Sequence, residues 1–96
     1  MKLAETTLAL RTAERELKDA SRKLLILQTI RDILMVNRPS PMRSSVIETL
    51  EAALTNDRER NISNAVIDLI ALATATDDSD AEEHYRNIAR RLACRA

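Results

Sequence analysis

The stretch Leu10–Leu27, LRTAERELKDASRKLLIL, places leucine and small residues at heptad spacing on one side of a helix and basic residues on the other. Leucine recurs every seven residues, and a small or apolar residue follows each leucine three positions later, as in the a and d positions of a coiled coil. We name this set the heptad seam: Leu3, Thr6, Leu10, Ala13, Leu17, Ala20, Leu24 and Leu27. Its small side chains allow close approach, so the pattern predicts contact with another helix.

The helix that carries this seam is predicted to run from about residue 3 to 36 and to have two different halves. From Leu24 to Val36 apolar residues occur on nearly all sides, which predicts that this half is buried nearly all round. Only the narrow seam is apolar before that point. We therefore expect residues 1–22 to form a projecting segment for oligomerisation or partner docking, and residues 23–96 to form the helical core.

Three breaks divide the rest of the chain into shorter helices. NRPSP (37–41) ends the first helix, and Ser40 followed by Pro41 is typical of an N-cap and the first helical position. We predict a second helix over about 41–55. After TND (55–57), where Asn56 or Asp57 is expected to cap, we predict a third helix over about 58–75. A fourth over about 79–94 is expected to begin with a Ser79–Glu82 capping box. The predicted fold is all-α, with residues 1–96 as a single four-helix domain.

The composition supports this fold and restricts the protein class. Gly, Phe and Trp are all absent, so a core built on Phe or Trp is excluded. The 15 basic residues balance 15 acidic ones, which gives a net charge of zero. Cys94 is the single cysteine, which excludes an intrachain disulfide and suits a reduced thiol in the cytoplasm. The apolar stretches are shorter than a membrane span and contain charges, so no membrane association is expected.

The residues needed for common active sites are missing from the sequence. Phosphate-binding loops need glycine, and metal sites need more ligands than the lone His84 supplies. The acidic run of residues 77–83 departs from a calcium-binding loop, with Glu83 where glycine belongs and Ala89 where the bidentate glutamate belongs. We therefore expect no catalytic site, no cofactor and no metal, and we expect that the protein is not an enzyme.

The interpretation that fits best is a non-enzymatic protein–protein interaction module, such as a small adaptor, inhibitor or regulatory subunit. Its expected interface residues are Leu3, Leu10, Ala13, Leu17 and Ala20. This segment is expected either to form a homodimer, as an antiparallel close-packed coiled coil, or to dock into a groove of another protein. One further possibility stays open at this point, since the fourth helix of the same chain is long enough to cover much of the seam.

The alternative is a dimeric regulator that associates with nucleic acid. Four basic residues, Arg11, Arg15, Lys18 and Arg22, form a row nearly opposite the heptad seam, and we call them the basic row. The start of the third helix, with Arg58 and Arg60, offers a second candidate as part of a helix-turn-helix. A solvent-exposed helix face with ordinary Glu14–Lys18 and Arg15–Asp19 pairs explains the same pattern.

Overall fold

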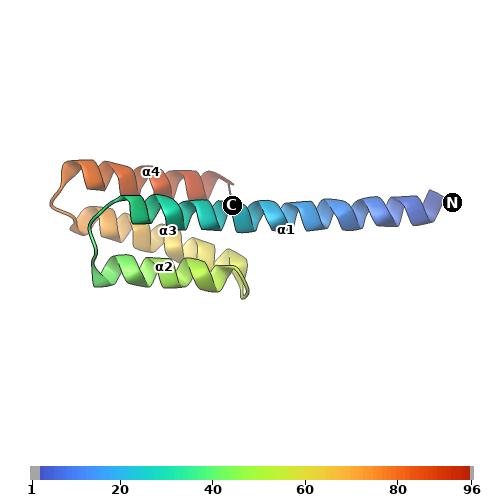
Figure 1. Ribbon diagram of the computed structural model, residues 1–96, viewed down its shortest axis with the longest axis horizontal. Coiled ribbons are helices and arrows are strands. Elements are labelled where there is room, and N and C mark those ends of the chain that lie inside the picture. Colours follow the sequence, from blue (N-terminus) through green and yellow to red (C-terminus); the bar gives the residue numbers. More distant parts are fainter. Residues whose placement is uncertain (1–2, 96) are drawn as a thin grey trace.

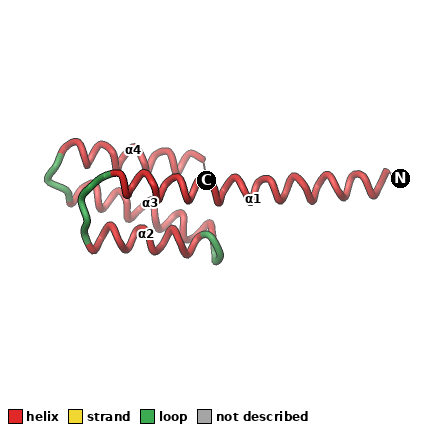
Figure 2. Tube along the Cα trace, in the orientation of Figure 1, coloured by secondary structure: helices red, strands yellow, loops and turns green. Residues whose placement is uncertain are grey.

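The computed structural model describes residues 3–95, and for Leu3 only the backbone. It confirms the predicted fold, with four α-helices and no strand among the described residues. The helices are α1 (Leu3–Met35), α2 (Pro41–Ala53), α3 (Arg58–Ala75) and α4 (Ser79–Arg95). Three short connections join them (Figure 2). The ends of α1, α2 and α4 fall within two residues of the predicted ends, as is usual where a helix frays.

The four helices form an antiparallel bundle from which α1 extends far beyond the others. α3 packs against α2 and α4, and α1 closes the bundle by contacting the same two helices. In Figure 1, α1 crosses the front of the bundle, with α4 above it, α2 below it and α3 behind. The N-terminal half of α1 then continues alone, so the longest extent of the molecule is 61 Å while the other two are 21 and 18 Å.

The core lies where the four helices face one another. Its buried residues are Ile26 and Ile33 of α1, Val46, Leu50 and Ala53 of α2, Ile62, Ala65, Leu69, Leu72 and Ala73 of α3, and Ala81, Tyr85, Ile88, Ala89 and Leu92 of α4. Alanines on α2, α3 and α4 let these helices pack closely without glycine. The apolar pattern of α3 predicts that Ile70 lies on its buried face and that Ile67 and Leu72 widen this face. Leu72 is buried, whereas Ile67 and Ile70 are 63% and 45% exposed, because α2 and α4 pack against other sides of α3.

The helix ends confirm one predicted cap and correct another. Ser40 caps α2 as predicted, because its Oγ accepts a hydrogen bond of 3.1 Å from the Arg43 N–H. At α4 the predicted Ser79–Glu82 capping box is wrong. Asp78 caps this helix through Oδ1, which accepts from the N–H groups of Asp80 (2.9 Å) and Ala81 (3.0 Å).

Asp78 is a better cap than Ser79 because its carboxylate also links two connections of the bundle. Arg38, in the α1–α2 connection, forms an ion pair with it. The backbone N–H of Ala81 is the main cause of a lowered Asp78 pKa, and the positive charge of Arg38 lowers it further. Glu82, the expected partner of Ser79, binds Arg86 one turn later at 3.1 Å.

The α2–α3 turn supplies the left-handed residue that a glycine-free chain needs. Because asparagine tolerates this conformation and the chain lacks glycine, the sequence predicts it at Asn37 or Asn56, but Asp57 adopts it, with a φ of 36°. The neighbouring Asn56 instead accepts a hydrogen bond of 2.7 Å at its carbonyl oxygen from the Asn61 side chain. α3 therefore begins directly after a tight turn, at Arg58.

Candidate functional site

We call the part of α1 that precedes Asp19 its free half, because it projects beyond the bundle. Every residue of this half whose side chain is described is exposed. All residues from Ala4 to Lys18 are exposed, and this range contains the seam residues Leu10, Ala13 and Leu17. The exposed fractions are 58% for Leu10 and 68% for Leu17. Ala20 is also exposed, while the side chain of Leu3 lies outside the described residues. The predicted interface residues that can be assessed are therefore open to a second helix.

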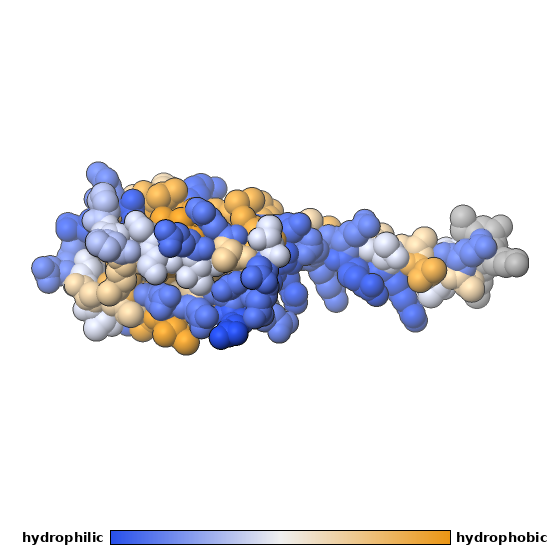
Figure 3. Space-filling view, turned by 90° about the horizontal axis from the view of Figure 1, so that it is seen from below, coloured by the Kyte–Doolittle hydropathy of each residue, from blue (hydrophilic) through white to orange (hydrophobic). Residues whose placement is uncertain are grey.

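The heptad seam continues along the half of α1 that belongs to the bundle, which corrects the prediction that this half is buried nearly all round. Leu24, Leu27 and Leu34 are 56%, 52% and 51% exposed. Leu34 lies seven residues after Leu27, so it continues the seam, and from here the name includes it. Apolar side chains are visible along two opposite margins of the bundle in Figure 3.

The seam and the bundle occupy opposite sides of α1. Ile26, Thr29 and Ile33 are buried and face the other helices. At about 100° per residue, Leu24 lies about 160° from Ile26 around the helix axis, and Leu27 about 100° from it. A helix that is amphipathic toward its own core normally has a polar outer side. Here the outer side carries five leucines at heptad spacing, so α1 has two apolar faces.

The fourth helix does not cover the seam. α4 contacts α1 on the bundle side and ends at Arg95, and the leucines on the outer side remain more than half exposed. The possibility that the chain uses its own α4 to bury the seam is thereby ruled out in this fold. Exposed apolar surface of this extent is typical of interaction sites.

Arg58 fixes the place where α1 leaves the bundle. Its guanidinium forms an ion pair with Asp19 of α1, and its Nε and Nη2 donate to the carbonyl oxygens of Ala53 (3.3 Å) and Leu54 (3.4 Å). Lys23 is the second partner of Asp19, at 3.2 Å. Hydrogen bonds from Arg58 and Lys23 lower the Asp19 pKa. Arg58 therefore has a structural role, and of the two arginines proposed at the start of α3, Arg60 alone is exposed.

The basic row lies on the same side of α1 as the bundle. Arg11, Arg15, Lys18 and Arg22 are all exposed. Neither the Glu14–Lys18 pair nor the Arg15–Asp19 pair forms, and Asp19 binds Lys23 and Arg58 instead. Among the described residues the four cations of the row have no ion pair. The last of them, Arg22, lies at the open end of the bundle, from which the free half of α1 projects.

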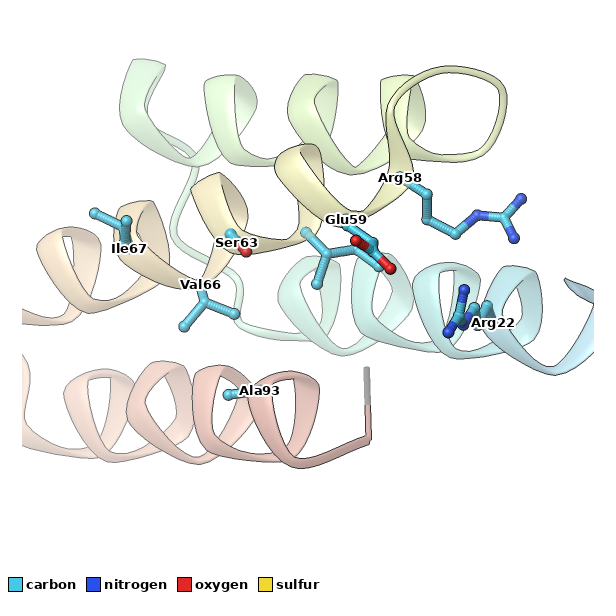
Figure 4. A pocket seen from close by; sticks show the side chains of 8 residues that line it. Arg22, Arg58, Glu59, Ser63, Val66, Ile67 and Ala93 are labelled. Carbon is cyan, nitrogen blue, oxygen red and sulfur yellow. The ribbon is translucent and has the colours of Figure 1, made fainter. Parts of the chain in front are cut away.

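A half-open pocket of about 470 Å³ lies at this open end, between α3, the end of α4 and α1 (Figure 4). Its wall is formed by Ile62, Val66, Ile67 and Ala93, with Arg22, Arg58, Glu59 and Ser63 at its polar side. Arg22 has no ion pair in the described part of the chain, whereas Arg58 is held by Asp19. The pocket is on the opposite side of α1 from the seam.

The described residues contain no group of three or more His, Cys, Asp or Glu side chains that could hold a metal ion. Cys94 is exposed near the end of α4, and His84 is exposed on the same helix. In this part of the chain, no helix has both the length and the apolar character needed to cross a membrane. Comparisons with protein-family models, curated proteins and solved structures find no match to the chain.

Proposed function

We propose that this protein is a non-enzymatic interaction module of the cytoplasm, and that the heptad seam of α1 is the surface through which it binds another helix. An adaptor, an inhibitor or a regulatory subunit would use such a surface. The partner helix belongs to a second copy of the chain or to another protein.

The observation that carries this proposal is the placement of the leucines. Leu10, Leu17, Leu24, Leu27 and Leu34 repeat at heptad spacing along the side of α1 that the bundle leaves open. Burial of a leucine side chain contributes about 1.5–3 kcal/mol. A core function does not explain five such residues on the outer side, whereas pairing with a helix buries all of them together.

The proposal predicts that Leu17→Glu removes assembly while the bundle stays folded. A charge placed in a contact between two helices must be desolvated without a partner, which is costly. We expect the apparent affinity to fall at least about tenfold, corresponding to about 1.4 kcal/mol. The measurement is sedimentation velocity of the purified chain, together with gel filtration of source-cell lysate that detects the chain in larger complexes.

Leu8→Glu is the matched control. Leu8 is 67% exposed, as against 68% for Leu17, and nine residues place the two on opposite sides of α1. The control should assemble as the wild type does. If Leu17→Glu, and the stronger Leu10→Glu with Leu17→Glu, also assemble as the wild type does in both measurements, the seam is not the binding surface.

The second candidate, a dimeric nucleic-acid-associated regulator, is favoured by the basic row. Four exposed cations without an ion pair in the described residues follow one side of α1, at a spacing that could track a phosphate backbone. The seam remains free for dimerisation in this case, because it lies on the other side of the helix.

This candidate predicts a steep salt dependence of binding to a labelled 30-base-pair duplex, measured by fluorescence anisotropy. The logarithm of the affinity should fall with the logarithm of salt concentration by about 0.9 for each neutralised phosphate. Arg11→Ala with Arg15→Ala should reduce that slope by about 2. Arg90→Ala with Arg95→Ala removes the same charge from α4 and should leave the slope unchanged. A flat salt dependence of the wild type excludes the candidate.

A further inference from the structure

We infer that the helix that occupies the heptad seam is α1 of a second copy of this chain, paired antiparallel so that Leu17 of each copy lies opposite Ala20 of the other. This inference rests on the proposed function, because it names the occupant of the same surface. It follows from side-chain size, charge and the position of the bundle.

The alternation of side-chain size along the seam favours the antiparallel direction. Parallel pairing places identical positions opposite each other, so Ala13 would face Ala13 and Ala20 would face Ala20 of the second copy, leaving poorly filled layers. Antiparallel pairing places a positions opposite d positions. In the central layers of the proposed register Leu17 meets Ala20 and Leu24 meets Ala13, so that a large residue meets a small one, and further out Leu10 meets Leu27.

Arg31 gives a second argument, because it occupies the a position that follows Leu24. It is exposed, and its guanidinium contacts the neighbouring Asp32 at 3.3 Å. Parallel pairing would place two Arg31 side chains directly opposite each other in the contact, which is unfavourable for like charges. In the proposed antiparallel register Arg31 lies opposite Thr6 of the second copy.

The residues that flank the seam select the register. The g positions include Glu16 and Lys23, and g positions face each other in an antiparallel pair, so charges there determine the alignment. In the proposed register Glu16 of each copy lies beside Lys23 of the other, which gives two pairs of opposite charge. A shift of one heptad in one direction places Glu16 beside Glu16, and a shift in the other direction places Lys23 beside Lys23.

The exposure and the ion pairs of Glu16 and Lys23 leave both side chains able to pair with a second copy. Glu16 is exposed and has no ion pair within the described residues. Lys23 binds Asp19 at 3.2 Å with about half of its side chain exposed, so a second carboxylate can reach it. Next to them, the small Ala9 of one copy lies beside the partly buried Ile30 of the other.

The bundle leaves room for this arrangement. In Figure 1, α4 and α2 flank α1 and α3 lies behind it, and the exposed seam leucines are on the side of α1 opposite the buried Ile26 and Ile33. Antiparallel copies place their bundles at opposite ends, where the free half of one α1 covers the bundle-held half of the other. The two 33-residue helices then overlap over about 50 Å, at 1.5 Å per residue. The contact is isologous, as in most homodimers.

Cysteine cross-linking tests both the direction and the register. In a Cys94→Ser background, one chain carries Leu10→Cys and a second, of different mass, carries Leu27→Cys. These positions are opposite each other only in the proposed register, within the short range that a disulfide spans. Mild oxidation is expected to produce a covalent heterodimer from the mixture and no covalent dimer from either chain alone.

The same cysteine variants also show the outcomes that would contradict the inference. Covalent dimers of each variant alone would show parallel pairing, and a mixture without any covalent product would show another register; both overturn the inference. The wild-type chain should sediment as a dimer at tens of micromolar. A monomer in that measurement, combined with complexes in lysate that Leu17→Glu removes, overturns the second copy as occupant but keeps the proposed function. Complexes that Leu17→Glu does not affect overturn both.

Discussion

Replacing Ile33 with alanine is expected to lower the free energy of unfolding by about 2–5 kcal/mol, the range for removing a buried isoleucine side chain. Leu34→Ala, at the next position, is expected to change it by about 0.5 kcal/mol or less, as for exposed sites. The contrast arises because Ile33 is fully buried against the other helices while Leu34 lies on the seam. Both variants are made in the Leu10→Glu, Leu17→Glu background, so that assembly does not contribute.

Urea unfolding monitored by circular dichroism measures this pair of variants. An unchanged dependence of the free energy on urea concentration would show that the folded and unfolded states expose the same surface as before. Equal destabilisation by Ile33→Ala and Leu34→Ala would mean that α1 is buried on both sides. That result would contradict the orientation of the seam, and with it the basis of the proposed function.

Tyr85 is expected to respond in opposite directions to two substitutions. Among the described residues it is the largest fully buried side chain, and its hydroxyl has no hydrogen-bond partner among them. Burial raises the pKa of this hydroxyl, and the positive charges of Arg43 and Arg38 oppose that shift. Tyr85→Ala leaves a large cavity and should lower the free energy of unfolding by about 3–5 kcal/mol. Tyr85→Phe removes only the unpaired polar group and should raise it by about 1 kcal/mol.

This prediction is tested by thermal and urea unfolding, which give the free energy of unfolding of the wild type, Tyr85→Phe and Tyr85→Ala. Ile88→Val is a useful control, because it removes one buried methylene group from the same helix and should cost about 0.5–1.5 kcal/mol. A loss of stability in Tyr85→Phe would reveal that the hydroxyl makes a favourable hydrogen bond in solution.

The sequence predicted the number, order and approximate ends of the helices because these depend on local chemistry. Pro39 and Pro41 determine the end of α1 and the start of α2, and Ser40 caps as its position implies. The cap of α4 was missed by one residue, since Ser79 and Asp78 are both good caps by type. The choice between them depends on Arg38, which is distant in sequence and forms an ion pair with Asp78.

The full length of the candidate site could not be predicted in the same way. Leu24, Leu25, Ile26 and Leu27 are all apolar, so hydrophobic periodicity does not show which of them faces the core. The positions of the neighbouring helices decide which of these side chains are buried, and α2 and α4 cover only one side of α1. The heptad spacing itself contained the signal, because Leu24, Leu27 and Leu34 continue the same repeat past the point where the helix becomes apolar all round. The role of Arg58 as an anchor for Asp19 depends on tertiary contact and had no sequence signal.

The continuity of α1 across the edge of the bundle also affects how its free half becomes helical. Forming the first turn is the unfavourable step of helix formation, and isolated helices of fewer than about 12–15 residues are marginal in water. In this chain the bundle-held half, anchored at Asp19 by Arg58, supplies a helical turn from which the free half extends. The free half therefore propagates an existing helix and does not have to nucleate one. The surface for a second helix is formed before contact, and association loses less backbone entropy than it would with a segment that folds on binding.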